Sequence, residues 1–120
     1  IEDCAIISAC VLIHQFCKVG GYGIIQGGTR FSVDVPPFIV VGKEPAHYCG
    51  VNLIGLRRRG FTREQILNIQ EIYRLIYASG YNTTHACEHI EAEIPECPER
   101  EYVLNFIRNS DRGIIAGNMM

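Results

Sequence analysis

The residues with the clearest chemical potential are three consecutive arginines, Arg57, Arg58 and Arg59, which stand just before Gly60 near the middle of the chain. Guanidinium groups bind phosphate and pyrophosphate through paired, charge-assisted hydrogen bonds. A run of charged residues is equally typical of a surface that only faces water. The spacing alone therefore leaves two interpretations open, an anion-binding cluster and a solvated charge run.

Histidines are the second candidate type. His14, beside Gln15, is predicted at a strand-to-corner position on the outer surface, where a lone histidine can be inert or can contact a ligand. His85 and His89 lie four residues apart on a predicted helix, near Cys87, a spacing that could serve a metal. Because no third ligand follows at a fixed spacing, the sequence predicts no metal site.

The element expected to position His14 is a six-residue repeat at the start of the chain. A large apolar residue returns every six positions: Ile1, Ile7, Ile13, Val19, Ile25 and Phe31. A second, mostly small set keeps the same period: Ala5, Val11, Cys17, Gly23, Thr29 and Val35. Each member of the second set comes two positions before the next large residue, so both sets point to the same face of a strand.

This repeat predicts a parallel β-helix, in which each hexad is a short strand plus a corner. With three strands in a turn, residues eighteen apart would stack: Ile1 on Val19, Ile7 on Ile25, and Ile13 on Phe31. The alternative is an ordinary strand-rich region in a chain that is 48% hydrophobic. The paired small residues and the apolar stacking favour the solenoid, although they do not fix its handedness.

The repeat is expected to stop at the tandem prolines Pro36-Pro37, which lack backbone donors, with a short strand over 38–41 after them. The apolar period then becomes helical, and Thr62 with Gln65 forms a capping box. The predicted helices run from Thr62 to Gly80, from Thr83 or Thr84 to Pro95, and from Pro98 onward. We therefore expect β-helix coils with an exit strand over residues 1–56, and a three-helix domain over residues 57–120.

Composition argues against several classes of protein. The net charge of −2 gives no support for a nucleic-acid partner. No apolar run approaches a membrane span, and no signal-peptide pattern opens the sequence. Six cysteines without a CxxC pair favour reduced thiols in a cytoplasmic protein. Because Ile1 is already in phase with the repeat, we expect the chain to be the C-terminal part of a longer protein.

Three segments carry a resemblance to a known family. They are residues 13–20 (IHQFCKVG), 34–38 (DVPPF) and 50–61 (GVNLIGLRRRGF), the last with the family-specific pattern VN-x-x-GL-x-RRGF. Through these segments, and over nearly its whole length, the chain resembles the acyl-ACP–UDP-N-acetylglucosamine O-acyltransferases. These enzymes perform the first step of lipid A synthesis in Gram-negative bacteria.

The resemblance implies a left-handed parallel β-helix followed by a small C-terminal helical domain, in a cytoplasmic homotrimer with active sites between subunits. It implies acyl carrier protein and UDP-N-acetylglucosamine as partners, and neither a cofactor nor a metal. The site residues that it implies are His14 and Gln15 near the glucosamine, Asn52, Arg58 and Arg59 at the nucleotide and its phosphates, and Gly27 beside the acyl-chain groove.

The implied reaction transfers a 3-hydroxyacyl chain from acyl carrier protein to the sugar 3-hydroxyl. A histidine removes the hydroxyl proton as general base, and a backbone N–H stabilises the oxyanion formed at the thioester. That histidine belongs to a coil before Ile1, so the resemblance places no catalytic residue in this chain and implies that the 120 residues alone are inactive. Ile54 and Pro45 also depart from the family, which often has an acidic residue and a histidine there.

Three alternatives stand beside this interpretation. The related N-acyltransferase of the same pathway shares the hexads, but the segment 50–61 disfavours it. A metal-dependent hydratase built from hexads would need three histidines around a subunit boundary, whereas only His14 lies in the hexads. A non-catalytic β-helix scaffold is the third alternative.

Overall fold

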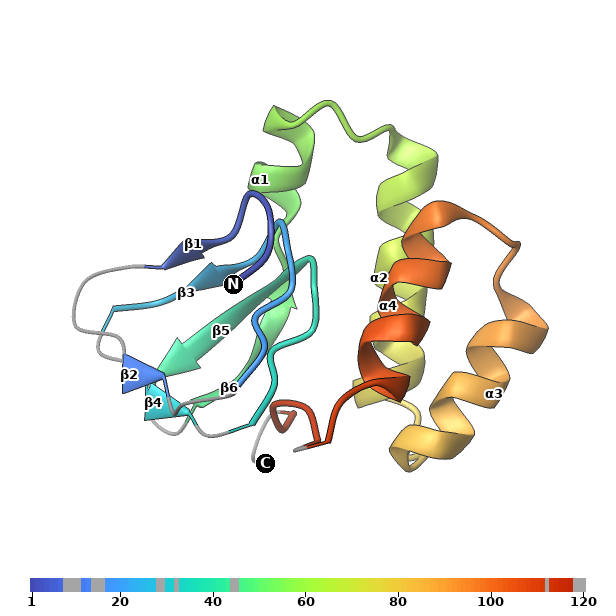
Figure 1. Ribbon diagram of the computed structural model, residues 1–120. Helices are drawn as coiled ribbons and strands as arrows, with labels where there is room; N and C mark the ends of the chain where they lie inside the picture. The colour runs from blue at the N-terminus through green and yellow to red at the C-terminus, as the bar shows by residue number, and fades with distance from the viewer. Residues whose placement is uncertain are drawn as a thin grey trace.

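A computed structural model describes residues 1–7, 12–13, 17–27, 30–31, 33–43, 46–111 and 113–117. Short strands stack on one side of the molecule and the longer helices pack on the other, with the first helix at one end of the strands (Figure 1). Within the described ranges, no helix has the length and hydrophobicity that crossing a bilayer requires. The hydrophobic core lies between the two layers and draws residues from both.

The strands are β1 (Ile6–Ile7), β2 (Leu12–Ile13), β3 (Ile24–Ile25), β4 (Arg30–Phe31), β5 (Ile39–Lys43) and β6 (Ala46–Val51). β1, β3, β5 and β6 form a four-stranded sheet in that order, and β2 pairs with β4. The pairs β1–β3, β2–β4 and β3–β5 are parallel, whereas β5 and β6 form an antiparallel hairpin. The region therefore consists of stacked short strands, as the hexads predict.

The register of the first two parallel pairs is the predicted one of eighteen residues. Ile7 lies opposite Ile25, and Ile13 lies opposite Phe31, so both of these predicted stacks are confirmed. Val19 and Ile25 are fully buried, which confirms that these members of the repeat point inward. The prediction is wrong for Ile1, which is 76% exposed because it lies before the turn that leads into β1 and outside the core.

The tandem prolines do not end the ladder, contrary to the sequence-based expectation. Parallel pairing resumes in β5, where Ile24 lies opposite Val40, sixteen residues later rather than eighteen. Pro36 and Pro37 occupy the corner before β5, where the missing N–H groups are not needed for the ladder. Beyond them, the Phe38 N–H donates to the Gly21 carbonyl at 2.9 Å and holds the chain against the preceding turn.

The helices are α1 (Leu53–Arg58), α2 (Arg63–Tyr77), α3 (Thr83–Glu93) and α4 (Pro98–Arg108). The capping box of α2 is confirmed, because Thr62 Oγ1 accepts the Gln65 N–H at 3.1 Å and Gln65 Oε1 accepts the Thr62 N–H at 2.7 Å. The sequence did not predict α1, whose six residues are too few to show a helical period. β6 was missed as well.

Tyrosines join the helices to the strands. The Tyr73 hydroxyl donates to the Pro37 carbonyl at 2.5 Å, and the Tyr77 hydroxyl donates to the Ile115 carbonyl at 2.8 Å. The Tyr48 ring, on β6, stacks on Tyr77 with 4.3 Å between ring centroids. Burial raises the pKa of both Tyr73 and Tyr77, so the two phenols keep their protons and remain donors.

Asp34 ties the C-terminal segment to the strand layer. Its carboxylate, in a residue only 1% exposed, accepts the Lys18 N–H at 2.7 Å and the Ser110 hydroxyl at 2.6 Å. Its backbone N–H donates to the Gly113 carbonyl, and its carbonyl accepts the Ile115 N–H, each at 2.9 Å. Figure 1 shows this segment running from α4 back to the strands.

Candidate functional site

A groove of about 810 Å³ lies where α1 meets the outer face of the four-stranded sheet. We call it the α1 groove, and its lining residues are Ile6, Ile24, Val40, Val51, Asn52, Leu53, Ile54, Gly55, Arg58 and Arg59. It brings together three of the predicted site residues, Asn52, Arg58 and Arg59. The sequence placed these three near each other, but gave no indication that strands far earlier in the chain would complete the site.

α1 begins at Asn52, which is only 5% exposed and whose side chain is fully engaged. Asn52 Oδ1 accepts the Gly55 N–H at 3.3 Å, which caps the helix, and Asn52 Nδ2 donates to the Tyr22 carbonyl at 3.0 Å. A Cβ on Gly55 would overlap the Asn52 amide, so the tight cap requires glycine there. Asn52 therefore helps to fix the helix that carries the arginines, and its predicted contact with the nucleotide stays a prediction.

Arg58 and Arg59 are exposed at the last turn of α1. Within the described part of the chain, neither guanidinium group forms a hydrogen bond or an ion pair. Arg57 faces a separate hollow, which Phe61, Arg63 and Leu67 line with it. The three arginines are thus divided between two surfaces, and the described residues provide no counter-ion for the two positive charges at the α1 groove.

The rest of the groove is apolar. Ile6, Ile24 and Val40 come from three neighbouring strands, and Ile6 is 52% exposed. Ile54, near the start of α1, is 65% exposed. A cationic rim above an apolar floor suits a ligand, or a covering surface, that presents anionic groups beside apolar ones. The apolar floor was not identified from the sequence, which directed attention to the inward-facing residues of the hexads.

Of the remaining predicted site residues, the structure describes only Gly27, which is not among the residues that line the α1 groove. His14 and Gln15 lie outside the residues that the structure describes. Gly27 is half-buried in the turn after β3, where the preceding Gln26 N–H donates to the Val41 carbonyl at 3.1 Å. The proposed contacts of these three residues therefore stay predictions.

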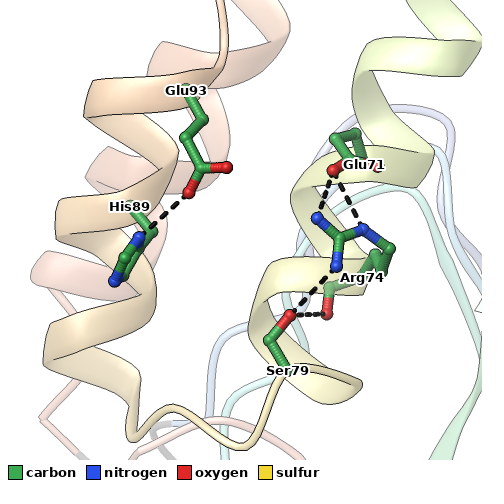
Figure 2. A network of polar contacts seen from close by, with 5 residues as sticks. All are labelled: Glu71, Arg74, Ser79, His89 and Glu93. Atoms are coloured by element: carbon green, nitrogen blue, oxygen red, sulfur yellow. Dashed lines mark hydrogen bonds and ion pairs between the residues drawn. The ribbon is translucent and has the colours of Figure 1, made fainter.

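The helix with His85 and His89 forms a local polar contact. On α3, His89 Nδ1 lies 2.9 Å from Glu93 Oε2, and the ring stacks on Tyr81 at 4.0 Å between centroids. Figure 2 shows the contact between His89 and Glu93 on α3 and, on the neighbouring helix α2, the contacts of Arg74 with Glu71 and with Ser79 just beyond the helix. Among the described residues, no three His, Cys, Asp or Glu side chains gather as a metal site would require.

Comparison with known proteins places this geometry in a class of transferases. The family model described as "UDP-N-acetylglucosamine O-acyltransferase; Domain 2" matches residues 34–115, which is more than half of the chain. The chain therefore belongs to the UDP-N-acetylglucosamine O-acyltransferase family. The match begins at Asp34 and includes α1 with its arginines.

Solved structures and curated relatives agree with this assignment. A UDP-N-acetylglucosamine acyltransferase from Bacteroides fragilis 9343 is 62% identical, with a TM-score of 0.92, over 94% of this chain and 45% of that chain. The enzyme from Francisella novicida is 37% identical, with a TM-score of 0.90, over 95% and 42%. The acyl-(acyl-carrier-protein)–UDP-N-acetylglucosamine O-acyltransferase of Alkalilimnicola ehrlichii is 38% identical over 96% of this chain and 45% of its own length. The chain thus spans less than half the length of the relatives that it matches.

Proposed function

We propose that this chain forms the C-terminal part of an enzyme that transfers a 3-hydroxyacyl chain from acyl carrier protein to the 3-hydroxyl of UDP-N-acetylglucosamine, the first step of lipid A synthesis. The relatives are named for acyl carrier protein and UDP-N-acetylglucosamine. The observation that carries the proposal is the pair Arg58 and Arg59, unpaired within the described residues at the rim of the α1 groove. A nucleotide diphosphate supplies the charge that these guanidinium groups lack.

The proposal also specifies the fold to which the short strands described above belong. We propose that residues 1–56 belong to a left-handed parallel β-helix and residues 57–120 to its helical domain, with the two parts meeting inside α1. The eighteen-residue parallel register of two strand pairs supports the coil. The enzyme would be a cytoplasmic homotrimer with its sites between subunits, and the exposed apolar floor at Ile6 supports a covering subunit there.

The site residues have separate roles in this proposal. Arg58 and Arg59 bind the phosphates, and Asn52, which also keeps α1 in place, contacts the nucleotide. His14 and Gln15 contact the sugar, and Gly27 borders the acyl chain. The general base that takes the proton from the sugar hydroxyl is a histidine from the part of the family that precedes this match, and the alkoxide then attacks the thioester. The chemistry requires no metal or nucleotide cofactor.

The arginine assignment is tested with Arg58→Ala in the complete protein, by calorimetric titration with UDP-N-acetylglucosamine. Loss of a charge-assisted hydrogen bond, worth about 1.5–3 kcal/mol, should weaken binding about tenfold or more. Arg63→Ala is the matched control, because Arg63 is exposed but lines the neighbouring hollow. Uridine, which has no phosphate, should not distinguish Arg58→Ala from the unmodified protein. If Arg58→Ala and Arg63→Ala bind the nucleotide sugar with equal affinity, the arginine cluster is only a solvated charge run.

A further inference from the structure

A thiol and an imidazole lie in direct contact on the hairpin strand β6. Cys49 Sγ is 3.2 Å from His47 Nε2, within the range of a hydrogen bond to sulfur. The two residues are two positions apart in one strand, so both side chains leave the same face of the sheet. When the imidazole carries its proton on Nδ1, Nε2 accepts the thiol proton, which makes His47 a base beside a nucleophile.

The neighbouring strand provides the space that the pair occupies. Gly42 on β5 lies opposite His47, and a Cβ at Gly42 would come within 2.6 Å of Cys49 Sγ and 2.8 Å of His47 Cε1. Both side chains therefore pack directly over the glycine backbone. Gly42 is two residues from Val40, so the pair shares the outer sheet face with the floor of the α1 groove. It lies on β6, however, at the opposite edge of the sheet from Ile6 on β1, where the covering subunit is proposed.

The other described cysteines lack this combination of exposure and a basic neighbour. Among the five cysteines that the structure describes, Cys49 alone is exposed. Cys87 is buried, and burial raises the pKa of the Cys87 and Cys97 thiols, which disfavours their thiolates. Cys87 and Cys97 should therefore react slowly with disulfides, because the thiolate is the nucleophile in thiol–disulfide exchange.

We propose that Cys49, with His47 as its base, is a modification site that forms mixed disulfides with low-molecular-weight disulfides. His47 Nε2 takes the thiol proton, and the thiolate sulfur attacks one sulfur of the small disulfide. The new bond joins Cys49 Sγ to that sulfur while the original disulfide bond breaks, and the departing thiolate takes up the proton. The exchange needs no other oxidant, and a second thiol reverses it. This site goes beyond the proposed acyl transfer and does not depend on it.

The test is exposure of the folded protein to limiting oxidised glutathione, followed by peptide mapping with mass spectrometry. Cys49 should be modified before Cys97 in the same molecules. His47→Ala should slow the modification of Cys49 by roughly tenfold at pH 7, because a positioned base is lost, and added imidazole should restore part of the rate. The rate at Cys97 should stay constant, and this internal reference separates loss of the base from general unfolding.

His89→Ala is the matched control, since it removes another half-exposed histidine far from any of these contacts. It should leave the Cys49 rate unchanged. Gly42→Ala is a second variant, which keeps both reactive groups but places a methyl group where the Cys49 and His47 side chains lie. Because the two groups would be pushed out of contact, this variant should also react more slowly. Modification of Cys49 no faster than that of Cys97, or an unchanged rate in His47→Ala, would overturn the proposal.

Discussion

Asn52 and the arginines that follow it lie in one segment but differ in their contacts with the rest of the protein. The Asn52 amide is buried and forms hydrogen bonds with the Tyr22 carbonyl and the Gly55 N–H. Arg58 and Arg59, in contrast, are exposed at the last turn of α1 and have no partner among the described residues. A pattern of residue types cannot separate the two cases, because both asparagine and arginine are common at nucleotide sites. The hydrogen bonds show which of these residues the protein itself holds, and one of them joins Asn52 to Tyr22, thirty positions earlier.

The residue-scale prediction concerns the stability that Asn52 supplies. Asn52→Ala removes a helix cap worth about 1 kcal/mol and a hydrogen bond worth about 1 kcal/mol. We expect the free energy of unfolding to fall by about 2 kcal/mol in a urea titration followed by circular dichroism.

Asn52→Ser is the matched variant, because serine is also a favoured helix cap that can accept the Gly55 N–H, whereas its shorter side chain loses the donor to Tyr22. It should be destabilised by about half as much as Asn52→Ala. If Asn52→Ala unfolds at the same urea concentration as the unmodified protein but binds nucleotide poorly, Asn52 contacts the ligand directly.

At the scale of elements, the sequence was informative where a pattern had room to repeat. The hexads predicted the eighteen-residue register of β1–β3 and β2–β4, and the capping box at Thr62 predicted where α2 begins. α1 has only six residues, and its start depends on the tertiary contact between Asn52 and Tyr22. In β6 the register shifts near Gly50, whose φ of +113° favours glycine, so the alternation of apolar residues is broken.

The candidate site was predictable only where its residues are neighbours in the sequence. Arg58 and Arg59 stand next to each other in the sequence, and their cluster was identified. The floor of the α1 groove joins Ile6, Ile24 and Val40, which come together only through strand pairing. Their hydrophobic character did not mark them as part of a site, because each lies next to an inward-facing apolar residue of the same strand.

The element-scale prediction concerns Gly55 in α1. Replacing glycine by alanine within a helix usually stabilises by up to about 1 kcal/mol. Here Gly55→Ala should destabilise instead, because the new methyl group would displace the capping amide of Asn52. The comparison is made by thermal unfolding against Ile54→Ala, an exposed position of the same helix that should change stability little. A higher melting temperature for Gly55→Ala would show that the cap is not under this constraint.

At the scale of the whole molecule, tyrosines are the main link between the strands and the helices. Tyr48, Tyr73, Tyr77 and Tyr102 all have a raised pKa, and burial is the largest cause in each case. Tyr102 accepts the Gly21 N–H at 2.8 Å and donates to Glu2, so it joins α4 to the start of the chain. The contact between the two layers therefore depends on phenols that remain protonated.

This arrangement predicts the dependence of stability on alkaline pH. An unfolded tyrosine loses its proton near pH 10, whereas the folded phenols retain theirs to higher pH. Over that range the unfolded state binds fewer protons, so the free energy of unfolding should be constant up to about pH 9 and fall as the pH rises further. Urea titrations at several pH values between 7 and about 11 would measure the free energy of unfolding, provided that unfolding is reversible at each pH.

Tyr73→Phe supplies the comparison for the pH dependence. It removes the hydroxyl that donates to the Pro37 carbonyl, so it should be less stable at pH 7. Its stability should also decline less steeply above pH 10, because one linked proton is gone. Parallel curves for the two proteins would exclude a contribution from Tyr73.

The Asp34 network also sets an order of events during synthesis. The hydroxyl that donates to the Asp34 carboxylate belongs to Ser110, which is synthesised 76 residues later. The phenol that accepts the Gly21 N–H belongs to Tyr102, 81 residues later. A ribosome that adds about 5–20 residues per second needs roughly 4–15 seconds to supply the first of these partners. During that interval the strands have emerged, but a carboxylate that ends up buried must stay in water. The strand layer therefore closes only after Ser110 has been added, and nascent chains halted before Ser110 should bind chaperones.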